Sequence, residues 1–563
     1  MKMRSVSLRP SFSSLQAITI LLLINLSGES YGQTSTWTGA QNTGSASARV
    51  LWSTAGNWSG TAIGGGNALI FSGNSKLTTN SNDFANGTAF ASITFDANAG
   101  AFVLSGNQIA LGSAGVINDD ASTQTINLAL SLANATTFNA NAGSLIIGGA
   151  ISGLGGINKT GANTLTLSGT NSYTGVTTIS NGILSVATIG NGGTAGNLGQ
   201  AGTAASNLVL SGGTLQYTGA TASTNRNFTL TNGTTSSIDV TTNTLTISGA
   251  SIATTGALTK AGAGTLILTG ANLNTGITTV SAGTLSLSGN GSLASAVNLS
   301  TTGAQFNISA ITPTGISLSS LDSVTGTTLA LGAKTLTVGS SDAAATIAGA
   351  ITGTGGGLTK TGSNILTLSG TNTFTGATTL QAGTLFLNSA NALGGNGAVS
   401  FTGGTLRYSA NNTSDLSGRL TLGSGTIRLD TNGQNVTWAS AISATQSGGL
   451  EKSGLGTLTL NGGNAYTGTT TLSAGTLAVG NNTALGTSSI ALNGGSLVAS
   501  GAARTLSNGI TVGAASTLDT AALGLSLAET SPPVPQQALS TSLSTAPAMV
   551  CSAEPFHKRR AIL

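Results

Sequence analysis

The sequence predicts an all-β protein in which the chain winds as a β-solenoid. Segments such as Thr-Leu-x-Leu alternate polar and apolar residues with period two, as a strand with one buried face does. These segments return about every 20 residues, which is too long for a tight hairpin and too short for a strand-helix-strand crossover. One solenoid coil fits this length: Leu and Val stack inward on the next coil, and Gly or Asn takes the corners.

A longer unit of about 30 residues occurs four times, near 153–186, 256–288, 355–387 and 448–479. Inside each copy two strand segments lie 19 residues apart, as from Asn364 to Gly383. Each coil of such an array contacts mainly its neighbours. The residues that define the repeat are three sets, which we expect to have structural roles: Lys159, Lys260, Lys360 and Lys452; Gly175, Gly276, Gly376 and Gly468; Leu165, Leu266, Leu366 and Leu458.

The composition agrees with a long, thin core. The chain of 563 residues contains 83 Gly and 7 Pro, and only 6% of its residues are charged, which is unlike an ordinary globular domain. The net charge of +4 comes from the two ends. Within 33–530, twelve basic residues balance twelve acidic ones. The charge therefore gives no sign of a nucleic-acid partner.

The pattern Lys-x-Gly-x-x-Thr-Leu-x-Leu-x-Gly-x-Asn-x-(Tyr/Phe)-Thr-Gly-x-Thr-Thr resembles the autotransporter-associated β-strand repeat, also called the passenger-associated transport repeat. Ile183 and Ile365 stand where the family prefers Thr, and copy two has Leu273 and Asn274 in place of x-aromatic. The resemblance implies a right-handed parallel β-helix exported to the surface of a Gram-negative-type cell.

The two ends differ from the body. Residues 1–32 have a basic start, a short apolar run and a small-x-small site, as secretory signal peptides do, and no later segment is apolar enough to span a membrane as a helix. Any outer-membrane association is therefore expected only through partners. A fifth copy is due after residue 519 but does not come. We interpret 521–563 as an atypical tail, disordered from 531 onwards, of a truncated or frame-shifted member.

Residues 33–100 are predicted to form an N-terminal cap and the first coils, before the β-helix of residues 101–520. Trp37, Trp52 and Trp58 cluster in this segment. They could cover the open apolar end of the solenoid. The alternative is an aromatic platform that contacts a glycan.

The sequence offers little for catalysis or metal binding. The single histidine, His557, and the single cysteine, Cys551, both lie in the tail, so the body cannot assemble a Ser-His-Asp triad or a His/Cys zinc site. Asp119 and Asp120 form the only adjacent acidic pair, and Asp430 lies two residues from Arg428 on one strand face. We interpret these as surface carboxylates offset by neighbours and predict no enzyme, cofactor or metal.

The four repeat lysines form a candidate positive ladder that could hold a polyanion. We favour solvated corner residues that also discourage edge pairing. Taken together, the sequence predicts an exported surface or extracellular solenoid with a structural or adhesive role, whose partners are surface glycans or receptors of host or neighbouring cells and the export machinery. The alternative is a β-helix that binds or cleaves carbohydrate.

Overall fold

The computed structural model describes most of the chain between residues 33 and 527. The described ranges are 33–40, 50–60, 63–73, 77–341, 343–421, 423–520, 524–527 and 539–540. The predicted signal peptide and nearly all of the predicted tail lie outside the described residues.

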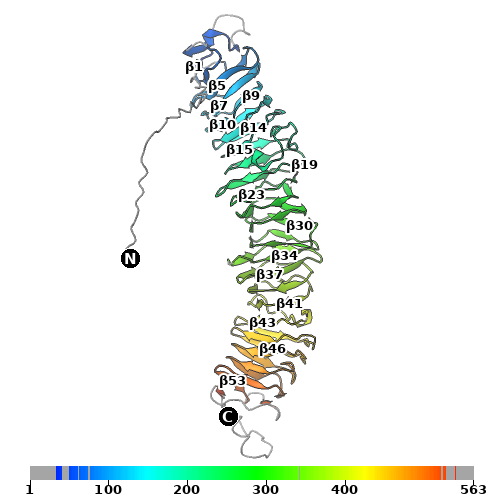
Figure 1. Cartoon of the computed structure of the whole chain (residues 1–563). Helices are drawn as coiled ribbons and strands as arrows, with labels where there is room; N and C mark the ends of the chain where they lie inside the picture. Colours follow the sequence, from blue (N-terminus) through cyan, green and yellow to red (C-terminus); the bar gives the residue numbers. More distant parts are fainter. Residues whose placement is uncertain are drawn as a thin grey trace, which may run out of the picture.

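The chain forms a β-solenoid, so the predicted fold class is confirmed. Strands follow one another along an elongated rod, from β1 (Thr34–Trp37) at one end to β53 (Ser516–Asp519) near the other (Figure 1). Nearly all strand pairs are parallel, with the pair of β1 and β2 (Trp58–Gly60) as an antiparallel exception. Helical structure in the described ranges consists of short 3-10 turns, among them η2 (Ala55–Asn57), η3 (Ala205–Asn207) and η4 (Ser417–Arg419).

One parallel ladder runs almost the full length of the rod. Its strands are β4 (Thr79–Asn82), β6 (Val103–Gly106), β8 (Gln124–Ile126), β11 (Leu145–Ile147), β14 (Thr164–Leu167), β16 (Ile183–Val186), β18 (Thr214–Tyr217), β21 (Thr235–Val240), β23 (Ala257–Ala261), β26 (Thr278–Val280), β29 (Val297–Leu299), β32 (Leu321–Ser323), β35 (Ala345–Ile347), β38 (Ile365–Leu368), β40 (Thr384–Leu387), β42 (Thr405–Arg407), β43 (Ile427–Asp430), β45 (Leu450–Ser453), β47 (Thr470–Leu472), β49 (Ile490–Leu492) and β52 (Ile510–Val512).

A second sheet covers the first part of the rod. Besides β1 and β2 it contains β3 (Ala68–Phe71), β5 (Thr88–Phe95), β7 (Ile109–Asn118), β9 (Leu130–Leu132), β10 (Thr136–Ala140), β12 (Ile151–Ser152), β13 (Ile157–Thr160), β15 (Thr177–Ile179), β17 (Leu208–Leu210) and β20 (Thr229–Leu230).

Shorter sheets complete the later coils. They are formed by β19 (Ala222–Thr224), β22 (Thr244–Ile247), β24 (Thr265–Leu268), β27 (Thr284–Gly289), β30 (Gln305–Ile311), β33 (Thr328–Ala330) and β36 (Ala350–Thr352); by β25 (Ala271–Asn272) and β28 (Ser292–Leu293); by β31 (Gly315–Leu318), β34 (Thr335–Val338), β37 (Gly357–Lys360), β39 (Thr378–Leu380) and β41 (Val399–Phe401); by β44 (Asn435–Trp438), β46 (Thr457–Leu460), β48 (Thr476–Val479), β50 (Ser496–Ala499), β53 and β55 (Leu539–Ser540); and by β51 (Arg504–Leu506) with β54 (Leu525–Leu527).

The 19-residue offset read from the sequence is the register between successive coils. Leu165 lies opposite Leu184, and Leu366 lies opposite Leu385. Copies two and four show the same register. The offset equals one coil because both strands of a pair occupy the same face of the solenoid, one coil apart.

Alternation along these strands separates the core from the surface. Leu366 is buried, whereas Thr367, the next residue of β38, is half-buried on the outer face. The repeat leucines Leu165, Leu266 and Leu458 are buried too. All belong to one hydrophobic core that extends from Trp37 to Leu525. The stacked leucines thus hold each coil on the next by burying apolar surface.

Candidate functional site

The four repeat lysines are buried, so the prediction that they are solvated corner residues is wrong. Lys159, Lys260, Lys360 and Lys452 each expose 0% of their surface. Each points from an inward position of its strand, where it pairs in register with an apolar residue of the preceding coil, such as Phe138 for Lys159. An ammonium at such a position is stable only if its donors are satisfied inside the protein.

Three backbone carbonyl oxygens surround each ammonium, and we call this arrangement the carbonyl cage. Two come from the next two residues of the same corner, and the third comes from a residue 22 positions later, in the following coil. The Nζ donors and their acceptors are Lys159 to Thr160 O (2.6 Å), Gly161 O (2.8 Å) and Asn181 O (3.1 Å); Lys260 to Ala261 O (2.7 Å), Gly262 O (2.7 Å) and Ala282 O (3.1 Å); Lys360 to Thr361 O, Gly362 O (2.9 Å) and Ala382 O (3.3 Å); and Lys452 to Ser453 O (2.8 Å), Gly454 O (2.7 Å) and Ala474 O (3.1 Å).

The glycine of each Lys-x-Gly corner makes the cage. Gly161 has φ of +74° and Gly262 of +75°, and the corresponding corners of copies three and four share this conformation. Left-handed backbone is easily adopted only by glycine. It turns the chain so that two successive carbonyl groups face back to the lysine side chain. The sequence feature that indicates the cage is therefore the glycine two residues after each lysine.

The electrostatics of the cage involve two opposing effects. Burial lowers the pKa of each of the four lysines to about 8, because water no longer solvates the charge. The three carbonyl oxygens favour the ammonium, since an uncharged amine can donate only two hydrogen bonds. For Lys260, Asp239 also favours the charged form. Each ammonium is fully buried and surrounded by its three carbonyl acceptors, so it is not presented to an external anion.

The lysines also do not share one face of the rod. Lys159 lies on β13 of the second sheet, and Lys360 lies on β37 of a shorter sheet. Lys260 and Lys452 lie on β23 and β45 of the long ladder. The positive ladder that the regular spacing suggested is therefore not formed.

The repeat glycines Gly175, Gly276, Gly376 and Gly468 lie where the backbones of two coils approach each other closely. A Cβ on Gly175 would lie 2.4 Å from Gly155 C, and one on Gly468 would lie 2.2 Å from Gly449 N. The corresponding contacts in copies two and three are 2.5 Å. Glycine is required here by the space between backbones.

Each copy also buries a threonine hydroxyl beside the aromatic position of the repeat. The Tyr173 hydroxyl lies 2.7 Å from Thr177 Oγ1, and the Tyr466 hydroxyl lies 2.5 Å from Thr470 Oγ1. In copy two the Ser295 hydroxyl lies 2.7 Å from Thr278 Oγ1. Copy three has Phe374 at this position, and within the described part of the chain the buried Thr378 Oγ1 has no hydrogen-bond partner. The side chains of Tyr173, Phe374 and Tyr466 are fully buried.

Arg226 is a buried cation that sequence reasoning missed. It is 3% exposed and donates to carbonyl oxygens of the long segment after copy one, including Gly190 O (3.0 Å), Ala201 O (3.0 Å) and Gly199 O (2.7 Å). Arg419 makes similar contacts with the segment after copy three. Because these acceptors are backbone atoms, no charge pattern in the sequence indicated them.

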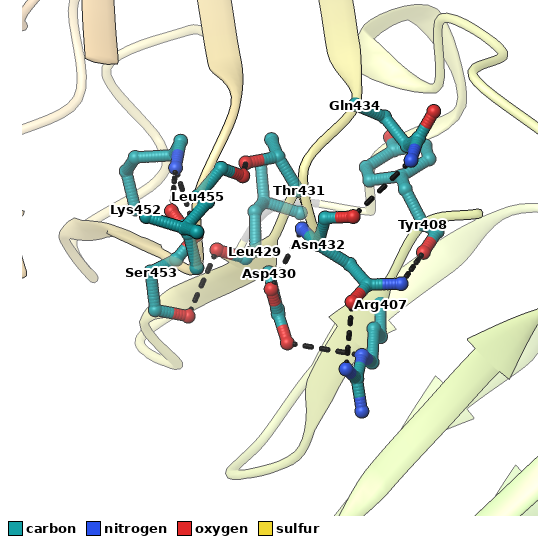
Figure 2. A network of polar contacts seen from close by, with 11 residues as sticks. Arg407, Tyr408, Leu429, Asp430, Thr431, Asn432, Gln434, Lys452, Ser453 and Leu455 are labelled. Carbon is teal, nitrogen blue, oxygen red and sulfur yellow. Dashed lines mark hydrogen bonds and ion pairs between the residues drawn. The ribbon is translucent and has the colours of Figure 1, made fainter. Parts of the chain in front are cut away.

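A network of polar contacts that includes charged side chains lies between copies three and four (Figure 2). Arg407 pairs with Asp430 at 3.2 Å, and its guanidinium donates to Asn432 Oδ1 at 2.7 Å. Arg428 pairs with Glu451 of the following coil. The sequence suggested that Asp430 is offset by Arg428 on its own strand. Instead both ion pairs join neighbouring coils, because residues two apart along a strand are farther apart than residues one coil apart.

Asp119 and Asp120 are occupied by hydrogen bonds. Asp119 accepts from Asn141 Nδ2 at 2.8 Å, and Asp120 accepts from the Ser122 amide at 2.7 Å. Burial raises the pKa of Asp120, but hydrogen bonds from Ser122 and Gly100 outweigh it, so the pKa is lowered overall. In the described residues no three His, Cys, Asp or Glu side chains gather where they could hold a metal ion.

The three tryptophans are buried, which contradicts the alternative of an exposed glycan platform. Trp37 and Trp52 expose 0% of their surface and Trp58 exposes 9%. The Trp37 and Trp58 rings pack edge to face with centroids 5.0 Å apart. Each indole nitrogen donates a hydrogen bond, for example from Trp52 to Asn80 Oδ1 at 2.7 Å. A capping role for this cluster stays a prediction.

The described residues contain no helix with the length and apolar character that crossing a membrane requires.

Comparison with known proteins agrees with the repeats. Residues 157–186, 258–287, 358–387 and 450–479 match the passenger-associated-transport-repeat family. The chain is also similar to the adhesin BmaC autotransporter of Brucella suis biovar 1 (strain 1330), with 47% identity over 124 residues. That match covers 22% of this chain and 4% of the relative. No solved structure matches the chain. The chain therefore carries four passenger-associated-transport repeats, each of which places a lysine in a carbonyl cage.

Proposed function

We propose that this chain is the passenger-type β-solenoid of an exported surface adhesin, in which a long rod presents contact residues away from the cell. The observation that carries the proposal is the match of four repeats within one β-solenoid, together with the similarity to an autotransporter adhesin. The proposed location is the cell surface or the extracellular space, reached by way of the leader at residues 1–32.

The distribution of charge suggests how such a rod would attach. Its repeat lysines are caged, Arg226 is buried, and Arg407 and Arg428 are paired with carboxylates. The outward positions of the strands carry mostly threonine and serine, as in the row Ser317, Thr337, Thr359, Thr379 and Ser400 across β31, β34, β37, β39 and β41. Contacts would then be made by hydrogen bonds and apolar groups, and salt would screen them little.

The test is attachment of beads coated with the full mature chain to host cells, neighbouring bacterial cells and a glycan array. We expect attachment that changes little between low and high salt. The matched control is a Leu366→Asp variant, which puts a carboxylate at a buried position and should break the stack locally. Its partner variant, Thr367→Ser on the outer face, should attach normally. Absence of attachment by the intact chain to every surface would contradict the proposal.

The proposed role includes no chemical step. The alternative of a polysaccharide-cleaving β-helix is tested by incubating the chain with pectin or alginate and calcium. The measurement is the absorbance of unsaturated products. We expect no product above the level given by the heat-unfolded chain. Enzyme-dependent release would replace the adhesive proposal with the catalytic one.

A further inference from the structure

Copy one differs from the other copies at the corner that completes its carbonyl cage. The third oxygen around Lys159 belongs to Asn181, which is followed by Gly182. The corresponding residues of the other cages are Ala282, Ala382 and Ala474, each also followed by glycine. Only the first cage therefore has an amide side chain next to a glycine nitrogen.

The geometry at Asn181 brings two reactive groups together. The Gly182 amide donates to Asn181 Oδ1 at 2.7 Å, so the Gly182 nitrogen lies close to the side-chain carbonyl group of the preceding residue. Asn181 is exposed, which gives water access. Gly182 has no side chain to obstruct ring closure, and its φ of +61° is natural for glycine.

Three other Asn-Gly pairs of the rod have their side-chain amide groups turned to neighbouring coils. Asn86 Oδ1 accepts from the Gln108 amide at 3.1 Å, and Asn232 Oδ1 accepts from the Thr255 amide at 2.8 Å. Asn432 is held at both ends of its amide, by Arg407 at 2.7 Å and by Tyr408 O at 3.1 Å (Figure 2). In each of these pairs the side-chain carbonyl oxygen accepts a hydrogen bond from a group other than the nitrogen of the following glycine.

We propose that Asn181 is a site of spontaneous deamidation that selectively alters the first carbonyl cage. The Gly182 nitrogen forms a bond to Asn181 Cγ, the bond from Cγ to Nδ2 breaks, and the amide proton of Gly182 leaves with that group as ammonia. Water then opens the resulting succinimide at either carbonyl, which gives aspartate or isoaspartate. No oxidation or reduction takes place. Water is the only co-reactant.

The two products act differently on Lys159. Isoaspartate routes the main chain through Cγ and adds a methylene to it, so the former Asn181 carbonyl group, which accepts from Lys159 Nζ, leaves the main chain and becomes a free α-carboxylate. Aspartate keeps the main chain and adds a carboxylate beside the cage, which favours the ammonium. Isoaspartate should therefore loosen the corner of copy one, while the cages of copies two to four keep all three acceptors.

The experiment is incubation of the full chain at mildly alkaline pH, followed by peptide mapping by mass spectrometry. We expect the conversion of amide to acid at Asn181 to be at least about tenfold faster than at Asn432, which corresponds to ~1.4 kcal/mol in activation free energy. The Asn432-Gly433 peptide of the same sample is the internal control. In denaturant the two rates should become similar, because the folded geometry is lost.

The matched variant is Asn181→Ala, which recreates the residue of the other three copies. It should melt like the unaltered chain and lose the conversion at this corner. Hydrogen exchange should become faster at residues 159–183 of the isoaspartate form but remain unchanged around Lys260. Equal rates at Asn181 and Asn432 in the folded chain, or no conversion at Asn181, would overturn the proposal.

Discussion

The lysine corner and the aromatic corner of the repeat differ in how much variation they tolerate. All four copies keep the lysine, the left-handed glycine and three carbonyl acceptors. At the aromatic corner the buried threonine hydroxyl forms a hydrogen bond with a tyrosine hydroxyl in copies one and four and with a serine hydroxyl in copy two. In copy three it has no described partner. A buried charge needs every donor satisfied, whereas one neutral hydroxyl can be satisfied in several ways or left unpaired at a modest cost.

The largest expected effect comes from removing one caged ammonium. Lys260→Met keeps the length of the side chain but leaves three inward carbonyl oxygens without their donor, so we expect the corner to lose about 2–4 kcal/mol of local stability. Hydrogen exchange at residues 257–284 measures this loss. Global melting is less informative, because a solenoid need not unfold in one step.

Lys334→Met is the matched control for this prediction. Lys334 precedes β34 outside the cages and is half-buried, so its loss should leave exchange nearly unchanged. Equal exchange in the Lys260 and Lys334 variants would show that the cage contributes nothing to stability.

A smaller effect is expected at the aromatic corner of copy one. Tyr173→Phe removes the hydroxyl that lies 2.7 Å from Thr177 and recreates the arrangement of copy three. We expect a loss of about 1 kcal/mol, the typical net value of one hydrogen bond. Exchange at β15 is the measurement, and an unchanged rate would mean that Thr177 finds another partner.

The reverse substitution should have an effect of similar size and opposite sign. Phe374→Tyr gives the buried Thr378 hydroxyl a partner and should stabilise β39 by about 1 kcal/mol or less, since the added oxygen must also fit. Phe401→Tyr on the neighbouring strand β41 is the control. It adds the same hydroxyl oxygen at a position away from the Thr378 hydroxyl. If Phe374→Tyr is destabilising, the pocket in copy three has closed around phenylalanine.

The last expected effect is a dependence of stability on pH. Burial lowers the pKa of the caged lysines to about 8, against 10.5 for the ordinary side chain. The unfolded chain then binds more protons than the folded chain above pH 8, so stability should rise with pH. The carbonyl acceptors offset part of this rise. Burial is the main cause that raises the pKa of Tyr173 to about 12 in the folded chain. Above pH 10 the tyrosines of the unfolded chain ionise while buried Tyr173 stays neutral, so stability should fall again.

Chemical denaturation at a series of pH values from neutral to alkaline measures this profile. The Lys260→Met variant should show a smaller rise between pH 8 and 10 than the unaltered chain. A profile that is flat or falls in this window would show that the carbonyl oxygens outweigh the cost of burying the charge.

The sequence alone determined the solenoid, its coil length and the facing of its strands. Period-two alternation assigned Leu366 to the core and Thr367 to the surface, and the 19-residue offset predicted the pairing of Leu366 with Leu385. These features follow from local patterns, because each coil is built from residues close in sequence and contacts mainly the next one.

Only the tertiary structure decided the fate of the polar residues. Lys159 looked like a solvated corner, yet it is buried because Asn181 O, one coil later, completes its set of acceptors. The sequence left open that Trp52 contacts a glycan, but the side chain lies in the core and its indole nitrogen donates a hydrogen bond to Asn80 Oδ1. Whether a polar side chain is inside depends on backbone atoms that converge in space. The sequence gives the identity of the side chains but not the positions of these carbonyl groups, which depend on the folded backbone.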